Sequence, residues 1–109
     1  MPQVTNFDGV PGTTVTFTAD ADTAFSLDDM GVDLTDTAGN RVHMVLISVE
    51  TNAARIAFTA SASATLGHLR YADDTFQVAG EAAANKLTMA NDTAGSNFTA
   101  QITPFFVAE

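Results

Sequence analysis

Carboxylates dominate the side chains of this sequence that could do chemistry. One stretch holds six of them and no basic residue: Asp20, Asp22, Asp28, Asp29, Asp33 and Asp36. Calcium takes six to eight oxygen ligands, so the first four of these residues raise an irregular calcium site as an alternative. An EF-hand loop beginning at Asp20 would need an oxygen ligand, a glycine and a glutamate at its fifth, sixth and twelfth positions. The sequence has Ala24, Phe25 and Gly31 there, so we expect a solvated acidic rim and no metal or cofactor.

The two histidines are the other candidates for acid–base or metal chemistry. His43 and His68 are distant in sequence and match neither an HExxH nor an HxH pattern. We expect both to be packed or hydrogen-bonded structural residues. No GxSxG elbow is present, and the vicinal pairs Asp28-Asp29 and Asp73-Asp74 would point to opposite faces of a strand or be solvated in loops. The sequence therefore predicts a protein that is not an enzyme.

Arg55 is one of only four basic residues in the chain and follows a strong apolar run. The stretch ISVETNAARIAFTA (47–60) reads as two strands around a loop at Thr51-Asn52-Ala53-Ala54. In such a hairpin Glu50 and Arg55 face each other, which stabilises the hairpin by roughly 0.2–1 kcal/mol. The alternative is that Arg55 contacts another subunit or a ligand.

The elements that must position these residues are strands, because Thr, Val, Ile and Phe alternate with turn-forming Gly, Asn and Asp. Strands are expected within 13–19, 24–29, 41–50, 54–60, 66–73, 74–80, 85–91 and 97–106, with a loop or short strand over 28–40 and one helical turn possible at 81–86. Ile56 and Phe58 are expected to point inward. We predict an all-β fold, an antiparallel β-sandwich of jelly-roll or Ig-like type with six to eight short strands, as one domain over residues 1–109.

Two segments suggest contacts with other subunits. The strand RVHMVLISVE (41–50) is apolar on both faces, so its Val45, Ile47 and Val49 could line either the core or an interface. Phe105 and Phe106 are adjacent, so that in a strand one enters the core while the other faces outward as an interface residue, unless both sides are buried. Pro104 removes a ladder donor and suggests an edge strand or a bulge.

The charge balance excludes several partners. The net charge is −9 with four Lys and Arg, so the chain lacks the basic footprint of a nucleic-acid binder and would repel anionic lipid. We expect no nucleic acid and no membrane as partners. The absence of cysteine excludes disulfides and thiolate metal sites. The N-terminal sequence shows no secretory signal, so synthesis in a cytoplasm is expected.

Residues 42–80 and 87–106 resemble a group of small structural proteins from tailed-phage virions. The shared pattern is an ISVETN…R-x-x-F segment, a T-x-G-H turn and a late T-x-x-S-x-x-T-x-Q-I-T strand. In this sequence it falls on Ile47 to Asn52, Arg55, Phe58, Thr65, Gly67, His68, Thr93, Ser96, Thr99 and Gln101 to Thr103. Where the pattern would have G-T-x-P-T after Phe58, this chain has Ala60 to Ser63.

The resemblance implies a non-enzymatic protein of the virion, with capsid decoration or cement proteins as the leading class. The implied partners are the major capsid protein or other virion proteins and further copies of the chain, as a trimer or dimer. The alternative is a tail, baseplate or fibre module, which could bind host glycans. These remain expectations from the resemblance.

Overall fold

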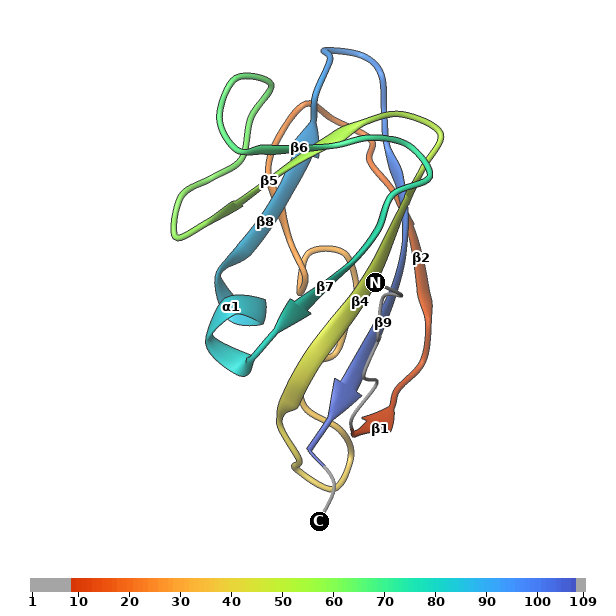
Figure 1. The fold of residues 1–109 in the computed structure, drawn as a ribbon, viewed down its shortest axis with the longest axis vertical. Coiled ribbons are helices and arrows are strands. Elements are labelled where there is room, and N and C mark those ends of the chain that lie inside the picture. The colour runs from red at the N-terminus through yellow and green to blue at the C-terminus, as the bar shows by residue number, and fades with distance from the viewer. Residues whose placement is uncertain (1–8, 108–109) are drawn as a thin grey trace, which may run out of the picture.

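The computed structural model describes residues 9–107, which form two antiparallel sheets packed face to face (Figure 1). The elements in chain order are β1 (Val10–Pro11), β2 (Val15–Thr18), β3 (Phe25–Ser26), β4 (Val42–Glu50), β5 (Ala54–Phe58), β6 (His68–Arg70), β7 (Thr75–Ala79), α1 (Glu81–Lys86), β8 (Leu87–Asn91) and β9 (Thr99–Phe106). A five-stranded sheet has the order β1-β9-β4-β7 with β2 also on β9, and a four-stranded sheet has the order β3-β8-β5-β6. The predicted all-β sandwich is confirmed. The strand count exceeds six to eight because β1 pairs separately from β2.

The longest strands, β4 and β9, lie side by side in the middle of the five-stranded sheet (Figure 1). The side chains of Val45, Ile47 and Val49 are fully buried and pack in one cluster with Ile56 and Met89 of the other sheet. The interface hypothesis for these three residues is therefore wrong. Their face of β4 is covered by the four-stranded sheet, so they form the core of the sandwich.

A bulge in β4 changes which residues face the core. Val42 pairs with Phe106 and Met44 pairs with Phe105, so His43 is the extra residue between them. Val42 and Val45 consequently both join the core, whereas His43 is exposed. The expectation of a packed His43 was wrong, because strict alternation fails across a bulge.

The predicted β4–β5 hairpin is also wrong. β4 pairs with β7 and β9, whereas β5 pairs with β6 and β8 in the other sheet. Residues 51–53 therefore cross between the sheets, with Thr51 in the left-handed region at φ 72°. Glu50 lies opposite Thr99, and Arg55 lies opposite Leu69 and Ala90. Glu50 and Arg55 do not form the expected cross-strand pair.

The two C-terminal aromatic residues are both buried. Phe106 belongs to the core cluster and is 4% exposed, while Phe105 lies outside that cluster and is 8% exposed. The expectation that one of them forms a bare outward-facing interface residue is therefore wrong, and the alternative of burial on both sides holds.

Pro104 lies in a central strand, so the edge-strand alternative of its edge-or-bulge prediction is wrong. Its carbonyl accepts a hydrogen bond from Gly12 N at 2.7 Å, so its backbone faces the N-terminal segment rather than β4. That segment is interrupted between β1 and β2. The pairing of β9 with the N-terminal segment is thus interrupted opposite Pro104. A proline is tolerated there because no backbone acceptor in the ladder requires its missing N–H.

The remaining elements follow the predictions with local exceptions. Helix α1 occupies the expected helical turn and buries Ala84. Residues 28–40 form turns and loops, in which Val32 is buried, and one isolated bridge joins Thr35 to Arg41. Ile56 points into the core as predicted, but Phe58 at the end of β5 is 38% exposed. Its outward position is a further correction.

Candidate functional site

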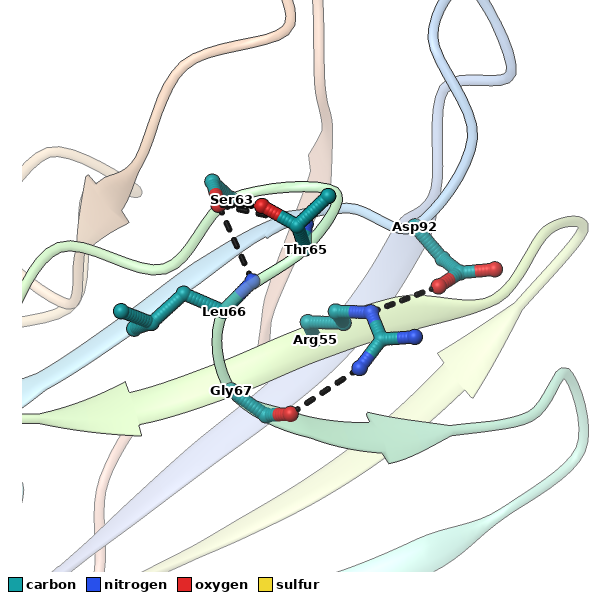
Figure 2. A network of polar contacts seen from close by, with 6 residues as sticks. All are labelled: Arg55, Ser63, Thr65, Leu66, Gly67 and Asp92. Carbon is teal, nitrogen blue, oxygen red and sulfur yellow. Dashed lines mark hydrogen bonds and ion pairs between the residues drawn. The ribbon is translucent and has the colours of Figure 1, made fainter.

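Arg55 joins three segments of the four-stranded sheet (Figure 2). Its Nε donates to Asp92 Oδ1 at 2.8 Å, and its Nη1 donates to the carbonyl oxygen of Gly67 at 3.1 Å. Asp92 follows β8, and Gly67 precedes β6, so the guanidinium connects the two strands that flank β5. Both charged side chains are about three-quarters buried. The predicted Glu50–Arg55 hairpin pair is thus replaced by a pair between Arg55 and Asp92.

Gly67 occupies a position that only glycine fits. Its φ is +122°, and a Cβ atom there would lie 2.6 Å from the carbonyl oxygen of Ile56. The backbone must therefore approach β5 closely enough for its own carbonyl to reach Arg55. The positive φ and the close contact with β5 explain why a glycine stands in the T-x-G-H segment.

The loop from residue 59 to 67, here called the covering loop, folds over the outer side of the four-stranded sheet. Ser63 Oγ accepts hydrogen bonds from the backbone N–H groups of Thr65 and Leu66 (Figure 2). Ala62 N donates to Thr88 Oγ1 at 2.9 Å. Ala62 packs there with Ala57 and Ala90, and all three are buried. The small residues of this loop therefore allow it to lie close to the sheet.

Asn91 is the buried polar residue at the loop end of the sandwich and is 2% exposed. Its Nδ2 donates to Asp22 Oδ1 and to Asn97 Oδ1, both at 2.9 Å, and its Oδ1 accepts from Phe98 N. The hydrogen bond from Asn91, followed by that from Gly95 N, lowers the pKa of Asp22 below its ordinary value of 3.8. We call these residues the Asn91 hub. It ties the β2–β3 loop to the β8–β9 loop.

The calcium alternative is not supported by this geometry. No group of three His, Cys, Asp or Glu side chains suited to a metal occurs within residues 9–107. Asp22 accepts hydrogen bonds in the Asn91 hub, and Asp29 accepts one from Ser26 N. Asp20 and Asp28 are not brought together with them into such a group. The carboxylates of the acidic stretch lie in separate loops and turns and do not surround one common site.

The histidines do not assemble a reactive site either. His43 lies on the five-stranded sheet, His68 begins β6 of the four-stranded sheet, and both are exposed. His68 is thus another correction to the expected packed histidine. A shallow depression of about 410 Å³ contains His68 together with the exposed apolar residues Phe58 and Leu66.

A second cavity, of about 210 Å³, opens beside β9 at the loop between residues 31 and 37. Pro104 and Phe106 contribute apolar walls, and Asp33 and Asp36 contribute carboxylates. The backbone N–H of Asn40 lowers the pKa of Asp36, partly opposed by burial. Because the carboxylate of Asp36 also accepts a hydrogen bond from Ala38 N, it closes its own turn.

Polar side chains form a hydrogen-bonded ladder over the outer side of the five-stranded sheet. The pairs and their O···O distances are Thr14–Thr103 (2.6 Å), Thr16–Gln101 (2.7 Å), Thr18–Thr99 (3.0 Å) and Ser48–Thr75 (3.0 Å). We call these eight residues and Gln77 the hydroxyl face. Within residues 9–107, Glu50 is the one carboxylate that lies in a strand; the others lie in loops, turns or α1. The outer side of the five-stranded sheet is therefore polar and internally hydrogen-bonded, with the Glu50 carboxylate at its margin accepting a hydrogen bond from Gln101 Nε2 at 3.4 Å.

The sequence predicted a strand within 13–19 but did not identify the partners of its threonines. It also missed the roles of Asn91 and Asp92. The spacing of Thr14, Thr16 and Thr18 against Thr99, Gln101 and Thr103 carried a signal for the ladder, because both stretches alternate with a period of two. No local signal connects Arg55 to a carboxylate 37 residues away.

Comparison with known proteins gives no similar protein, so the site is interpreted from its own residues and contacts. No family model matches the chain, and neither a curated protein nor a solved structure matches it. Among residues 9–107, no helix is both long enough and apolar enough to cross a membrane.

Proposed function

We propose that this protein is a non-enzymatic structural component of a tailed-phage virion that decorates and stabilises the head. The proposal begins from the sequence resemblance to small virion proteins described above. Its partners would be the major capsid protein and further copies of the chain. The two interface segments first suggested by the sequence lie in the core, so the contacts must come from other surfaces.

The residues that carry the resemblance have architectural roles in this fold, which supports a shared structural protein rather than a shared catalyst. Arg55 and Gly67 hold β5, β6 and β8 together. Asn52 Nδ2 donates to the carbonyl oxygen of Asn97 at 2.9 Å and thereby ties the inter-sheet crossing to the β8–β9 loop. Thr99 and Gln101 belong to the hydroxyl face.

The observation that carries the proposal is the hydroxyl face itself. Burying a polar group is costly when it loses its hydrogen bond and much less costly when a partner stays with it. All side chains of this face except that of Gln77 are paired across strands, so these eight keep hydrogen bonds when water leaves. The centres of protein interfaces are also depleted of charge. The hydroxyl face therefore suits a contact with a broad protein surface such as the capsid.

This assignment predicts where the acidity lies in the particle. With the hydroxyl face against the capsid, the carboxylates of residues 9–107 other than Glu50 would remain in loops, turns and α1, and binding would depend weakly on salt. The rival arrangement places the acidic stretch Asp20–Asp36 against basic patches of the capsid protein. That arrangement predicts a strong fall in binding as ionic strength rises.

The test is co-sedimentation of the purified protein with capsids assembled without it, at about 50 mM and about 500 mM NaCl. Thr16→Glu places a charge in the hydroxyl face and should weaken capsid binding at least about tenfold, which corresponds to about 1.4 kcal/mol. Thr37→Glu makes the same change at an exposed loop residue and should bind as the unmodified protein does. Equal losses in the two variants, or no binding by the unmodified protein, would contradict the proposal.

One exposed aromatic residue favours a second candidate function, a glycan-binding module of the tail or baseplate. Tyr71 is 63% exposed, and its backbone N–H bonds to the carboxylate of Asp74 in the same turn. An aromatic ring beside carboxylates can stack on a sugar and bond to its hydroxyl groups. A glycan titration followed by NMR, with Tyr71→Ala as the variant, separates this function from head decoration.

A further inference from the structure

The edge strand β7 presents a row of unused backbone hydrogen-bonding groups. Val49 N donates to Asp74 O, and Gly80 N donates to His43 O, so the backbone groups of the even-numbered residues here face β4. Successive residues of a strand direct these groups to opposite sides. The N–H and C=O groups of Thr75, Gln77 and Ala79 thus face away from β4. They make no hydrogen bond with any part of the chain that the structure describes.

This edge lacks the features that protect free strands in most proteins. Such edges are usually shortened, bulged, interrupted by proline or charged, because an open edge pairs with other strands. β7 has five residues with no proline, charge or register shift. By contrast, β3 has only two residues, β1 contains Pro11, and the three-residue β6 carries Arg70. The other uncharged edge strand, β2, has four residues and is one residue shorter than β7.

The core-facing side chains of β7 are covered by the other sheet. The backbone edge that points away from β4 is the part of the strand left open. Phe76 and Val78 are buried in the core, and the guanidinium of Arg70 lies 4.5 Å from the centre of the Phe76 ring. The outward residues Thr75, Gln77 and Ala79 are exposed. A partner strand can therefore approach in the plane of the sheet without displacing core side chains.

We propose that β7 pairs antiparallel with β7 of a second copy across a two-fold axis and joins the two five-stranded sheets into one. With Gln77 of each copy opposite the other, Thr75 lies opposite Ala79 of the partner subunit. Each of these three opposed pairs exchanges both of its backbone hydrogen bonds, about six in all. The hydroxyl faces of the two copies then form one continuous surface.

A second copy is the occupant that the uncharged, self-complementary strand favours, although the net charge opposes it. The chain carries a net charge of −9, so two copies repel wherever their acidic loops meet. The strand β7 itself is uncharged, and an antiparallel pair of identical strands is self-complementary. The register places Asp73 near Glu81 of the partner subunit at both ends. Salt that screens these carboxylates should therefore strengthen the dimer.

This inference deepens the proposed function, whose homo-oligomer it specifies, but its test uses only the isolated protein. Failure of the dimer therefore leaves the capsid experiment standing, and failure of capsid binding leaves the dimer standing. The first measurement is sedimentation equilibrium of the full chain over a wide concentration range at low and high salt. We expect a monomer–dimer equilibrium that shifts toward dimer as salt rises.

Gln77→Lys places two ammonium groups at the two-fold axis and should weaken the dimer at least about tenfold. Thr37→Lys adds the same charge at an exposed loop residue away from β7 and should change the dimer constant by less than about twofold. Both variants reduce the net negative charge, so general repulsion would change in the same direction for both. A dimer that survives Gln77→Lys unchanged would overturn the assignment.

Amide hydrogen exchange of the unmodified protein tests the interface without any variant. The amides of Thr75, Gln77 and Ala79 should become protected as concentration favours the dimer, while those of exposed loops should not. A strict monomer over the whole concentration range would overturn the proposal. So would a dimer in which these three amides exchange as fast as they do in the monomer.

Discussion

The outer sides of the two sheets differ in how far other parts of the chain cover them. The four-stranded sheet is closed, because the covering loop buries Ala57 and Ala90 and bonds to Thr88, while Arg55 joins β5 to both neighbours. The five-stranded sheet is open, because its hydroxyl face and the edge of β7 have no cover from the described residues. The difference separates residues that hold the fold from residues that remain free to contact other molecules.

The residues that carry the sequence resemblance are also divided between the covered and the uncovered sheet. Arg55 and Gly67 lie on the closed side, where their contacts are satisfied within the chain. Thr99 and Gln101 lie on the open side, where their side chains bond only to neighbouring strands and remain partly exposed. Substitutions on the closed side should therefore affect stability, and those on the open side should affect association.

The largest expected effect is on the closed side, at Gly67. Gly67→Ala must accommodate both a φ of +122° and a Cβ atom 2.6 Å from a backbone oxygen, so the free energy of unfolding should fall by at least about 3 kcal/mol. Gly39→Ala is the control, because its φ is +87° but no atom lies within 4 Å of the added Cβ. The control should lose about 1–2 kcal/mol. Urea denaturation measures both, and equal losses would show that the close approach to β5 is unimportant.

Breaking the ion pairs should change the free energy of unfolding by an intermediate amount. Arg55→Met keeps the apolar stem but removes the hydrogen bonds to Asp92 and Gly67, so it should cost about 1–3 kcal/mol of unfolding free energy. Arg41→Met removes a pair with Glu81 whose side chains are 71% and 40% exposed. That loss should be at most about 1 kcal/mol. Denaturation curves that rank the two variants in the opposite order would contradict a structural role for Arg55.

On the open side, loss of one hydroxyl group should hardly change stability. Thr16→Val removes the hydrogen bond to Gln101 from an exposed pair, and water can replace the missing partner. The free energy of unfolding should change by no more than about 0.5 kcal/mol. A loss as large as that of Arg55→Met would mean that the ladder holds the fold rather than serving a contact surface.

A pH series examines the loop end that joins the two sheets. The folded-state pKa of Asp22 lies below 3.8, so the stability that its carboxylate adds is present above about pH 4 and is lost as pH falls through the lowered value. Asp22→Asn should therefore be less stable than the unmodified protein at pH 6, and the difference should shrink as the pH is lowered through the folded-state pKa. Asp20→Asn changes the same charge without breaking a hydrogen bond of the Asn91 hub. If both variants behave alike, net charge and not the hub explains the effect.

Alternation along the chain determined the strands, because a half-buried strand must place apolar residues at every second position. Phe76 and Val78 point inward as their pattern requires, and the Gly, Asn and Asp clusters mark the turns. Charge placement was equally local, since acidic residues favour turns and are disfavoured inside strands. The all-β class and the acidic loops therefore follow from the sequence itself.

Pairing was decided only by the tertiary structure, because a strand's hydrogen-bonding edges accept any neighbour and its own sequence does not select one. The segment after Glu50 could have formed a hairpin, yet it crosses to the other sheet, so that Arg55 meets Asp92 instead of Glu50. One bulge moved His43 out of the core, and the second sheet turned the two-sided apolar strand into the centre of the sandwich. The same non-local packing left β7 with a neighbour on one side only, and so created the open edge at which a second copy is proposed to bind.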